Sequence, residues 1–362
     1  MITAARNLGM KALRRLGRAH KPVVRLLRQR ERAQEQAAFV REARRVEQQI
    51  ARVTAGRRPI IAGPWLAEVG YEALYWVPFL RWFRDAHRIP PERLVIVSRG
   101  GVRDWYEGIG GSYIELFDHF TPSELAVRNE ARQRDLEAGG RKQTGFGALD
   151  DDIIRRVRER LGMGEAAVCH PSLMFRLFRH VWHGTLPYDW LWTHTDYEMM
   201  RAPALPALAG LPEAFVAVKF YSGTALPGGA ETRDLLRTLA ARAAEAHPLV
   251  LLDTGLAVDD HDDVTFAGLP NVISAREWMQ PSNNLGVQSA LIARARYFLG
   301  TCGGLAWLAP FFGTPALAVY ADDRQLAPHL YVQRQAGRRV GAAEFTPIDL
   351  RAWARLGAFN GR

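Results

Sequence analysis

From residue 59 onward, short apolar runs alternate with longer amphipathic stretches. Each apolar run ends in glycine or a polar turn, and the stretch that follows it has the periodicity of a helix. In the first half of this region the apolar runs lie at 59–64, 93–101, 113–118 and 166–172. Strands that alternate with helices in this way predict parallel sheets with crossover helices.

The alternation restarts after a proline-rich stretch at 201–214, which is typical of an interdomain linker. Further predicted strands lie at 215–223, 248–255, 271–274, 297–301 and 315–320. The fold class expected is therefore α/β, with two Rossmann-like domains facing a cleft. The predicted parts are a helical extension over 1–56, an N-terminal domain over 57–205, a C-terminal domain over 206–340, and a helix within 341–362 that closes on the N-terminal domain.

The N-terminal extension carries the excess positive charge of the chain. Residues 1–58 hold 16 Lys or Arg and 4 Glu, a surplus of 12, whereas the remainder holds 32 basic and 34 acidic residues. Residues 1–30 carry 9 basic and no acidic side chains beside an apolar face, which favours an anionic membrane surface. A solvated basic tail is the alternative. Farther on, one face bears Phe39, Ala43, Val46, Ile50 and Val53, a spacing that suits packing on a partner helix or on the body.

Composition excludes several classes of protein. The basic segment has a single aromatic residue, so nucleic-acid binding by base stacking is not expected. No apolar run is as long as the roughly 20 residues of a membrane span, and two cysteines make neither a disulfide framework nor a metal site. The acidic run at 259–263 is expected to be a solvated loop, so no metal is predicted. A cytoplasmic protein, peripheral to the inner face of the membrane, is the expectation.

The stretch GTCGGLAWLAPFFGTPALAVY at 300–320 is a strand, a glycine turn, a helix and a second strand. Unpaired amides at a helix start attract anions, glycine lets a phosphate approach the backbone, and Thr301 adds a hydroxyl. Close helix–strand packing by Gly303 and Gly304 is the alternative. Cys302 lies where a thiol pKa is usually lowered. Without a neighbouring base, however, Cys302 is expected to be a small buried residue.

This stretch resembles the donor-binding turn of GT-B glycosyltransferases, and it is similar to that of heptosyltransferases of bacterial surface-polysaccharide synthesis. The resemblance implies that residues 301–304 hold a nucleotide diphosphate. The chain departs from the heptosyltransferase pattern, because Gly300 stands where an acidic residue is usual and Trp307 where a histidine is usual.

Other strand ends of the C-terminal domain supply the remaining donor-site candidates. The resemblance implies a cation on the donor phosphate, which fits Lys219, beside Tyr221 and Ser222; an edge-strand lysine is the alternative. The next strand ends in Asp253, Thr254 and Gly255. Asp253 is expected either to accept a ribose hydroxyl or to cap the turn that follows it. Asn284 and Gln288, four residues apart on one helix face, are expected to read the nucleobase or the sugar edge. As the alternative, an N-cap at Ser282 or Asn283 explains the start of that helix without any ligand.

The N-terminal domain is expected to bind the acceptor. Glu68 follows the first strand, where the resemblance implies a general base that deprotonates the acceptor hydroxyl, and Glu72 one turn later is the reserve. Favourable placement near a helix start is the alternative for both. Arg99 and His170 end two further strands and are expected to face the cleft, in contact with the acceptor or the leaving phosphate.

Together these features predict a glycosyltransferase that uses a nucleotide sugar as co-substrate, without a further cofactor. Its acceptor is expected to be a lipid-linked or surface glycan. The rivals are a nucleotide-sugar epimerase of the same fold and a catalytically silent binding subunit. A dinucleotide oxidoreductase fits less well, because no G-x-G-x-x-G follows the first strand.

Overall fold

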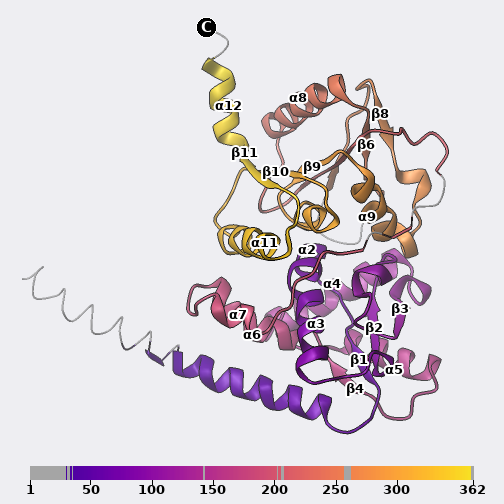
Figure 1. Ribbon diagram of the computed structural model, residues 1–362, viewed down its shortest axis with the longest axis vertical. Coiled ribbons are helices and arrows are strands. Elements are labelled where there is room, and N and C mark those ends of the chain that lie inside the picture. The colour runs from indigo at the N-terminus through magenta and orange to yellow at the C-terminus, as the bar shows by residue number, and fades with distance from the viewer. Residues whose placement is uncertain are drawn as a thin grey trace, which may run out of the picture.

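The computed structural model describes residues 30, 33, 34, 36–141, 143–201, 203–204, 208–256 and 262–359. Two α/β domains lie one above the other, and each is built on a largely parallel sheet (Figure 1). The predicted fold class, two Rossmann-like domains that face a cleft, is confirmed.

The N-terminal domain has a four-stranded parallel sheet in the order β3-β2-β1-β4. Its strands are β1 (Ile60–Ala62), β2 (Leu94–Ser98), β3 (Ser112–Glu115) and β4 (Ala167–Cys169). The helices are α2 (Val69–Tyr71), the π-helical turn Glu72–Trp76, α3 (Val77–Ala86), α4 (Pro122–Ala138), α5 (Ala148–Arg160), α6 (Ser172–Trp182) and α7 (Asp189–Trp192). All four strands coincide with apolar runs of the sequence, because a parallel sheet is buried on both faces.

The C-terminal domain has the strand order β11-β10-β9-β5-β6-β8. Its strands are β5 (Val216–Ser222), β6 (Leu249–Leu251), β8 (Val272–Ser274), β9 (Tyr297–Thr301), β10 (Ala316–Tyr320), β11 (Phe345–Asp349) and the antiparallel β7 (Asp262–Val264). The helices are α8 (Ala230–Ala246), α9 (Asn284–Arg294), α10 (Gly304–Leu308), α11 (Ala327–Val340) and α12 (Leu350–Phe359). The direction of winding reverses between β5 and β9, and ligands of such sheets bind at that point.

Two strands, β7 and β11, are missing from the sequence prediction. β11 contains Pro347, which cannot donate a ladder hydrogen bond and is tolerated here because β11 is an edge strand. β7 lies in the acidic run that was expected to be a solvated loop, and that expectation is wrong for Asp262–Val264, which pairs with β5. Residues 257–261 lie outside the described part of the chain.

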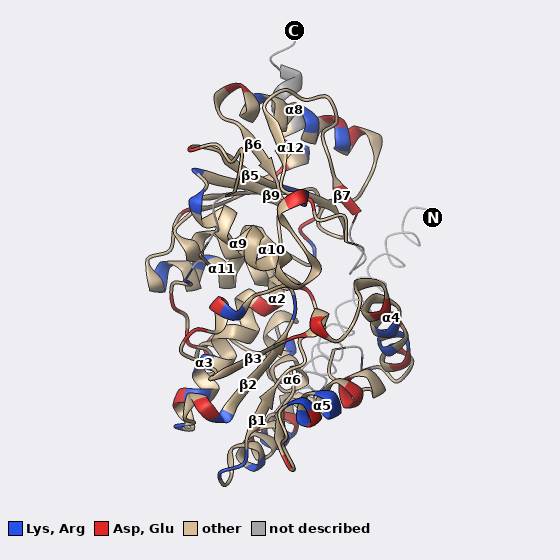
Figure 2. Ribbon diagram, turned by 90° about the vertical axis from the view of Figure 1, so that its right-hand side faces the viewer, with Lys and Arg blue, Asp and Glu red and all other residues tan. Residues whose placement is uncertain are grey.

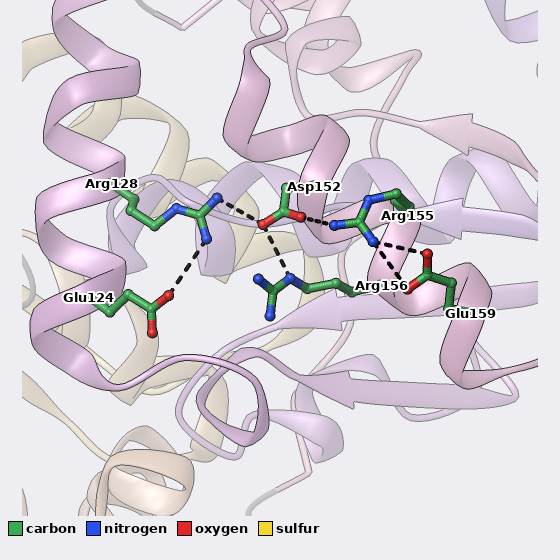
Figure 3. Close-up of polar contacts among 6 residues, drawn as sticks. All are labelled: Glu124, Arg128, Asp152, Arg155, Arg156 and Glu159. Carbon is green, nitrogen blue, oxygen red and sulfur yellow. Dashed lines mark hydrogen bonds and ion pairs between the residues drawn. The ribbon is translucent and has the colours of Figure 1, made fainter.

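Charged side chains join α4 to α5 on the surface of the N-terminal domain (Figure 3). Asp152 accepts hydrogen bonds from Arg128 at 2.8 Å, from Arg156 at 3.1 Å and from Arg155. Partial burial raises the pKa of Asp152, but the hydrogen bonds from the arginines outweigh it and lower the pKa to about 2. Asp152 is therefore ionised at neutral pH and holds the two helices together.

A helix over residues 36–54 docks on the N-terminal domain. Phe39, Val46 and Ile50 are buried, and Phe39 packs edge-on against Trp190 with ring centroids 5.2 Å apart. Arg176 of α6 donates to Glu42 of this helix. This face was predicted to pack on a partner helix or on the body of the protein, and in the structure it packs on the body. A membrane surface was predicted for residues 1–30, of which 1–29 lie outside the described residues.

The helix that crosses to the N-terminal domain is α11, not α12. His329 of α11 lies between the hydroxyls of Tyr75, 2.6 Å from Nδ1, and Tyr71, 3.1 Å from Nε2. Leu350 of α12 is buried in the C-terminal core, and α12 extends away from the other domain (Figure 1). The expectation that the last helix closes on the N-terminal domain is therefore wrong, because β11 returns the chain to the sheet before α12 begins.

Candidate active site

A pocket lies at the junction of the two domains. The helices α2 and α10 face each other at this junction (Figure 2). Its walls come from both domains. The N-terminal wall is formed by Glu68, Val69, Gly70, Arg99 and Phe117. Among the polar residues and glycines of the C-terminal wall are Lys219, Tyr221, Thr254, Asp263, Asn284, Gln288 and Gly304. Eight of the residues singled out from the sequence therefore meet in one place, although more than 230 positions separate Glu68 from Gly304.

The glycine turn contributes fewer amides than expected. The N–H of Cys302 donates to the carbonyl of Val319, and the hydroxyl of Thr301 bridges the backbone N–H and C=O of Tyr221. Neither residue lines the pocket, and neither does Gly303. No acceptor among the described residues bonds the N–H of Gly304 or Leu305, and both residues line the pocket. The predicted anion site thus reduces to these two amides.

Cys302 is buried, as expected, but the expectation of a lowered thiol pKa is wrong. Burial raises the pKa of Cys302 to about 12. Its side chain lies inside the domain, and α10 is only five residues long, so the helix dipole is too small to offset the loss of hydration. Because α10 is so short, the binding of an anion here depends on local amides and cations and not on the helix dipole.

Lys219 lies on the pocket wall but is already paired. Its ammonium lies 2.7 Å from both carboxylate oxygens of Asp263, which explains how a lysine is accommodated inside an apolar strand. Strand β7 brings Asp263 there, because its residues pair with Phe220, Tyr221 and Ser222 at the end of β5. Ser222 itself does not line the pocket.

Thr254 lines the pocket, but its two neighbours do not. Asp253 is buried, accepts from the Ser274 hydroxyl at 2.7 Å and pairs with Arg276 at 3.1 Å. Gly255 has φ +64° and lies against the Arg276 guanidinium. Asp253 therefore contacts residues at the end of β8 and after it, and no hydrogen bond among the described residues joins its carboxylate to the turn that it was expected to cap; its role toward a ribose stays a prediction.

Asn284 and Gln288 share one face of α9, as predicted, and both line the pocket. The Gln288 amide nitrogen donates to the backbone oxygen of Asn284 at 3.1 Å and to its side-chain oxygen at 3.3 Å. The Asn284 amide nitrogen in turn donates to the carbonyl of Pro281 at 2.6 Å. These bonds fix both amides at the pocket wall, and their role toward a ligand remains a prediction.

On the opposite wall, Glu68 precedes α2 with an extended backbone and makes no side-chain capping bond to it. Its position at the start of α2 agrees with the alternative, favourable placement of the carboxylate near a helix start, and Glu68 also lines the pocket with an exposed side chain. Arg99 is 5% exposed and donates to the carbonyl of Ala67 at 3.2 Å. No carboxylate in the described part of the chain lies within ion-pair distance of Arg99. Arg99 does interact electrostatically with the buried carboxyl of Glu72, but a buried guanidinium without an ion pair beside a pocket is stabilised further by an anion that binds there.

Glu72 does not share the face of Glu68, so that prediction is wrong. The π-helical turn from Glu72 to Trp76 shifts the helix register and directs the fully buried carboxyl toward β2. There it accepts from the hydroxyls of Ser98 and Tyr106, each at 2.5 Å. Burial raises the pKa of Glu72 to about 7, against the effect of the two hydrogen bonds and of Arg99.

This raised pKa predicts a pH-dependent stability. In the unfolded chain the pKa is about 4.3, so between there and about 7 the folded protein holds a proton that the unfolded chain releases. The contribution of Glu72 is fully present below the lower value and lost as pH rises through 7. Gln does not titrate, so only the wild type loses this contribution. The free energy of unfolding of E72Q minus that of wild type should therefore rise by about 3 kcal/mol from pH 5 to pH 8. Urea unfolding at several pH values measures this difference, and parallel curves would contradict it.

His170 lies away from the pocket, so its predicted position is also wrong. Its Nε2 lies 3.2 Å from Asp150, and its Nδ1 lies 2.8 Å from the hydroxyl of Ser172. β4 is on the far side of β1 from β2 and β3, and the pocket lies beyond the ends of β1, β2 and β3. Chain order alone does not show this, because strand order within the sheet decides which strand ends meet.

Sequence reasoning missed two polar or aromatic residues of the pocket, Phe117 and Asp263. Phe117 follows β3, a strand that was identified, so its position at a strand end was available as a signal. Asp263 was assigned to a solvated loop. An apolar valine directly after two aspartates was the only sign of the short strand that holds it.

No protein-family model matches the chain, and no curated protein matches it in sequence. Among solved structures, the iron-containing dodecameric glycosyltransferase TibC from enterotoxigenic E. coli H10407 is 14% identical with a TM-score of 0.40, over 73% of this chain and 59% of TibC. E. coli ADP-heptose LPS heptosyltransferase II is 12% identical with a TM-score of 0.35, over 75% and 87% of the two chains. A UDP-GlcNAc 2-epimerase from Methanocaldococcus jannaschii is 8% identical with a TM-score of 0.30, over 81% and 88%.

The chain thus spans less than two thirds of the length of TibC. These overlaps assign no function to the chain, and a function has to follow from its own residues. Within the described residues, no helix has the length and apolar character of a membrane span, and no three His, Cys, Asp or Glu side chains gather as metal ligands.

Proposed function

We propose that the protein is a glycosyltransferase that moves a sugar from a nucleotide-sugar donor to a glycan or lipid-linked acceptor. One observation carries this proposal. The junction places Glu68 and the buried Arg99 of one domain opposite the ammonium of Lys219 and the amides of Gly304 and Leu305, which have no acceptor among the described residues. A carboxylate that faces an anion site across a cleft is the arrangement that sugar transfer from a diphosphate donor requires.

The anion site would hold the diphosphate of the donor. As the bond from the anomeric carbon to the diphosphate breaks, negative charge grows on the leaving oxygens. Fixed donors pointing at that charge lower the barrier, because they need no reorganisation during the reaction. Arg99, Lys219 and the two amides would supply this stabilisation in place of a bound metal ion.

Glu68 would act as the general base. Transfer with inversion requires removal of a proton from the acceptor hydroxyl as that oxygen attacks the anomeric carbon. Glu68 lines the pocket from the N-terminal domain, on the opposite wall from Gly304. A carboxylate on the face away from the leaving group is suitably placed for that step.

The membrane-facing part of the proposal concerns residues 1–30. Their basic side chains would hold the protein at an anionic membrane surface, where a lipid-linked acceptor is found. The docked helix at 36–54 connects this segment to the N-terminal domain, the domain proposed to bind the acceptor.

A thermal-shift panel tests the proposed donor. UDP, GDP, ADP and CMP, each alone and as a sugar conjugate, should include at least one ligand that raises Tm. At 100 times Kd, binding stabilises the folded protein by about 2.7 kcal/mol. If all of these compounds leave Tm unchanged, the proposal is wrong. Turnover of a nucleotide sugar without any acceptor would point instead to an epimerase.

A further inference from the structure

The contacts of Lys219 and Asp263 leave one hydrogen-bonding position open on each side chain. An ammonium has three N–H donors, and the Lys219 ammonium lies 2.7 Å from both oxygens of Asp263. A carboxylate has about four acceptor positions, of which Lys219 occupies two and the N–H of Thr254 a third, on Oδ2 at 3.3 Å. Among the described residues, nothing uses the remaining acceptor position, on Oδ1.

The backbone fixes where these open positions point. Asp263 lies opposite Tyr221 in the antiparallel β5–β7 pair, so their side chains share one face, and Lys219 lies on the same face two residues earlier. All three residues line the pocket. On this wall of the pocket the pair therefore has one N–H and one carboxylate lone pair that no described residue uses.

A carboxylate beside a diphosphate site requires an explanation, because it repels the phosphates. Two kinds of ligand offset this repulsion, namely a cation and a hydroxyl that donates a hydrogen bond to the carboxylate. The Lys219 ammonium lies against both oxygens, so a divalent ion would first have to displace it. A hydroxyl needs only the open position on Oδ1.

We propose that Lys219 and Asp263 form one subsite that reads a phosphate and a neighbouring hydroxyl together. The third N–H of Lys219 would bind a diphosphate oxygen, and Oδ1 of Asp263 would accept from a hydroxyl of the sugar attached to that phosphate. This inference rests on the proposed nucleotide-sugar donor. It assigns to Asp263 a role in selecting hydroxyl-bearing sugars, which is separate from holding the phosphate.

The hydroxyl can belong to the ribose of the nucleotide or to the transferred sugar, and matched ligands separate the two. Isothermal titration of the full chain compares ADP and GDP with their 2′-deoxy analogues, and UDP-glucose with UDP-2-deoxyglucose. Inorganic pyrophosphate serves as the probe without any hydroxyl. Wild type should prefer the hydroxyl-bearing member of one pair by at least about tenfold.

The test variant is D263N, which keeps the shape of the side chain and removes its charge. D263N should lose most of the hydroxyl preference, whereas its affinity for pyrophosphate should stay the same or rise, because repulsion is removed and Lys219 is released. The matched control is D262N, on the same strand but exposed and outside the pocket lining, which should behave like wild type.

Three results would overturn the inference. The first is a D263N variant that retains the full hydroxyl preference. The second is a D263N variant that binds pyrophosphate and sugar nucleotides more weakly by one common factor, as expected if Asp263 only orients Lys219. The third is binding that EDTA abolishes in wild type but not in D263N, which would make Asp263 a metal ligand. If wild type binds none of the probes, the donor proposal itself fails, and the two failures are thereby distinguished.

Discussion

Replacing Glu68 by Gln should lower the rate of sugar transfer by about 10²–10⁴-fold, the usual contribution of a general base. An amide has nearly the shape of the carboxylate but cannot accept the proton of the acceptor hydroxyl. Glu68 is not among the groups proposed to hold the diphosphate, although Arg99 of the same wall is, so the Kd for the nucleotide should stay the same or fall as a negative charge is removed. Release of the nucleoside diphosphate from the donor identified by thermal shift, in the presence of glycan or lipid-linked acceptors, measures the rate.

The control for this experiment is E92Q. Glu92 is exposed at the amino end of β2, whereas the pocket lies beyond the carboxyl end of that strand, so E92Q should be as active as wild type. Unchanged transfer in E68Q, with intact nucleotide binding, would rule out Glu68 as the base. If wild type itself binds the donor but transfers nothing to any acceptor, the protein is better described as a silent binding subunit.

Replacing Gly70 by Ala should weaken nucleotide binding by more than about tenfold. A Cβ atom at this position would lie 2.9 Å from the amide nitrogen of Gly304 and 2.9 Å from the Trp307 ring. The first is backbone and the second is buried, so neither can move aside cheaply, and overpacking of this kind costs about 1–3 kcal/mol. The strain is relieved most directly by separating α2 from α10, which widens the junction between the two walls. Isothermal titration with the nucleotide and a melting curve measure both effects.

The matched control is G337A, a second glycine-to-alanine change within a helix. The nearest atom to a Cβ at Gly337 of α11 is 3.5 Å away, which is an ordinary contact. G337A should therefore bind nucleotide like wild type and gain up to about 1 kcal/mol of stability. Wild-type affinity in G70A would show that the close approach of α2 and α10 is unimportant for the pocket.

The difference between the candidates that meet in the pocket and those that do not has a common cause. Gly304 and Arg99 follow strands whose carboxyl ends face the other domain, Lys219 lies within such a strand, and all three line the pocket. His170 also follows a strand, but β4 lies at the edge of its sheet away from the pocket. A local pattern identifies the end of a strand but contains no information on where that strand lies in the sheet.

Glu68, which precedes α2 with an extended backbone, and Glu72 show the same limit at one helix start. Four residues apart on a regular helix, they would share a face. The π-helical turn that begins at Glu72 inserts extra backbone and directs the second carboxyl into the core, against Ser98 and Tyr106. Tertiary packing favours this turn, and no residue in the segment predicts it from the sequence.

The sequence by itself determined the two α/β domains, nine of the strands and the docking face of the 36–54 helix. These features depend on burial, which the spacing of apolar residues records directly. Only the tertiary structure decided which strand ends meet, that α11 and not α12 crosses between the domains, and that Asp263 pairs with Lys219. Those contacts join residues far apart in the chain, and they depend on strand order and on the fit between two domain surfaces, neither of which a local pattern encodes.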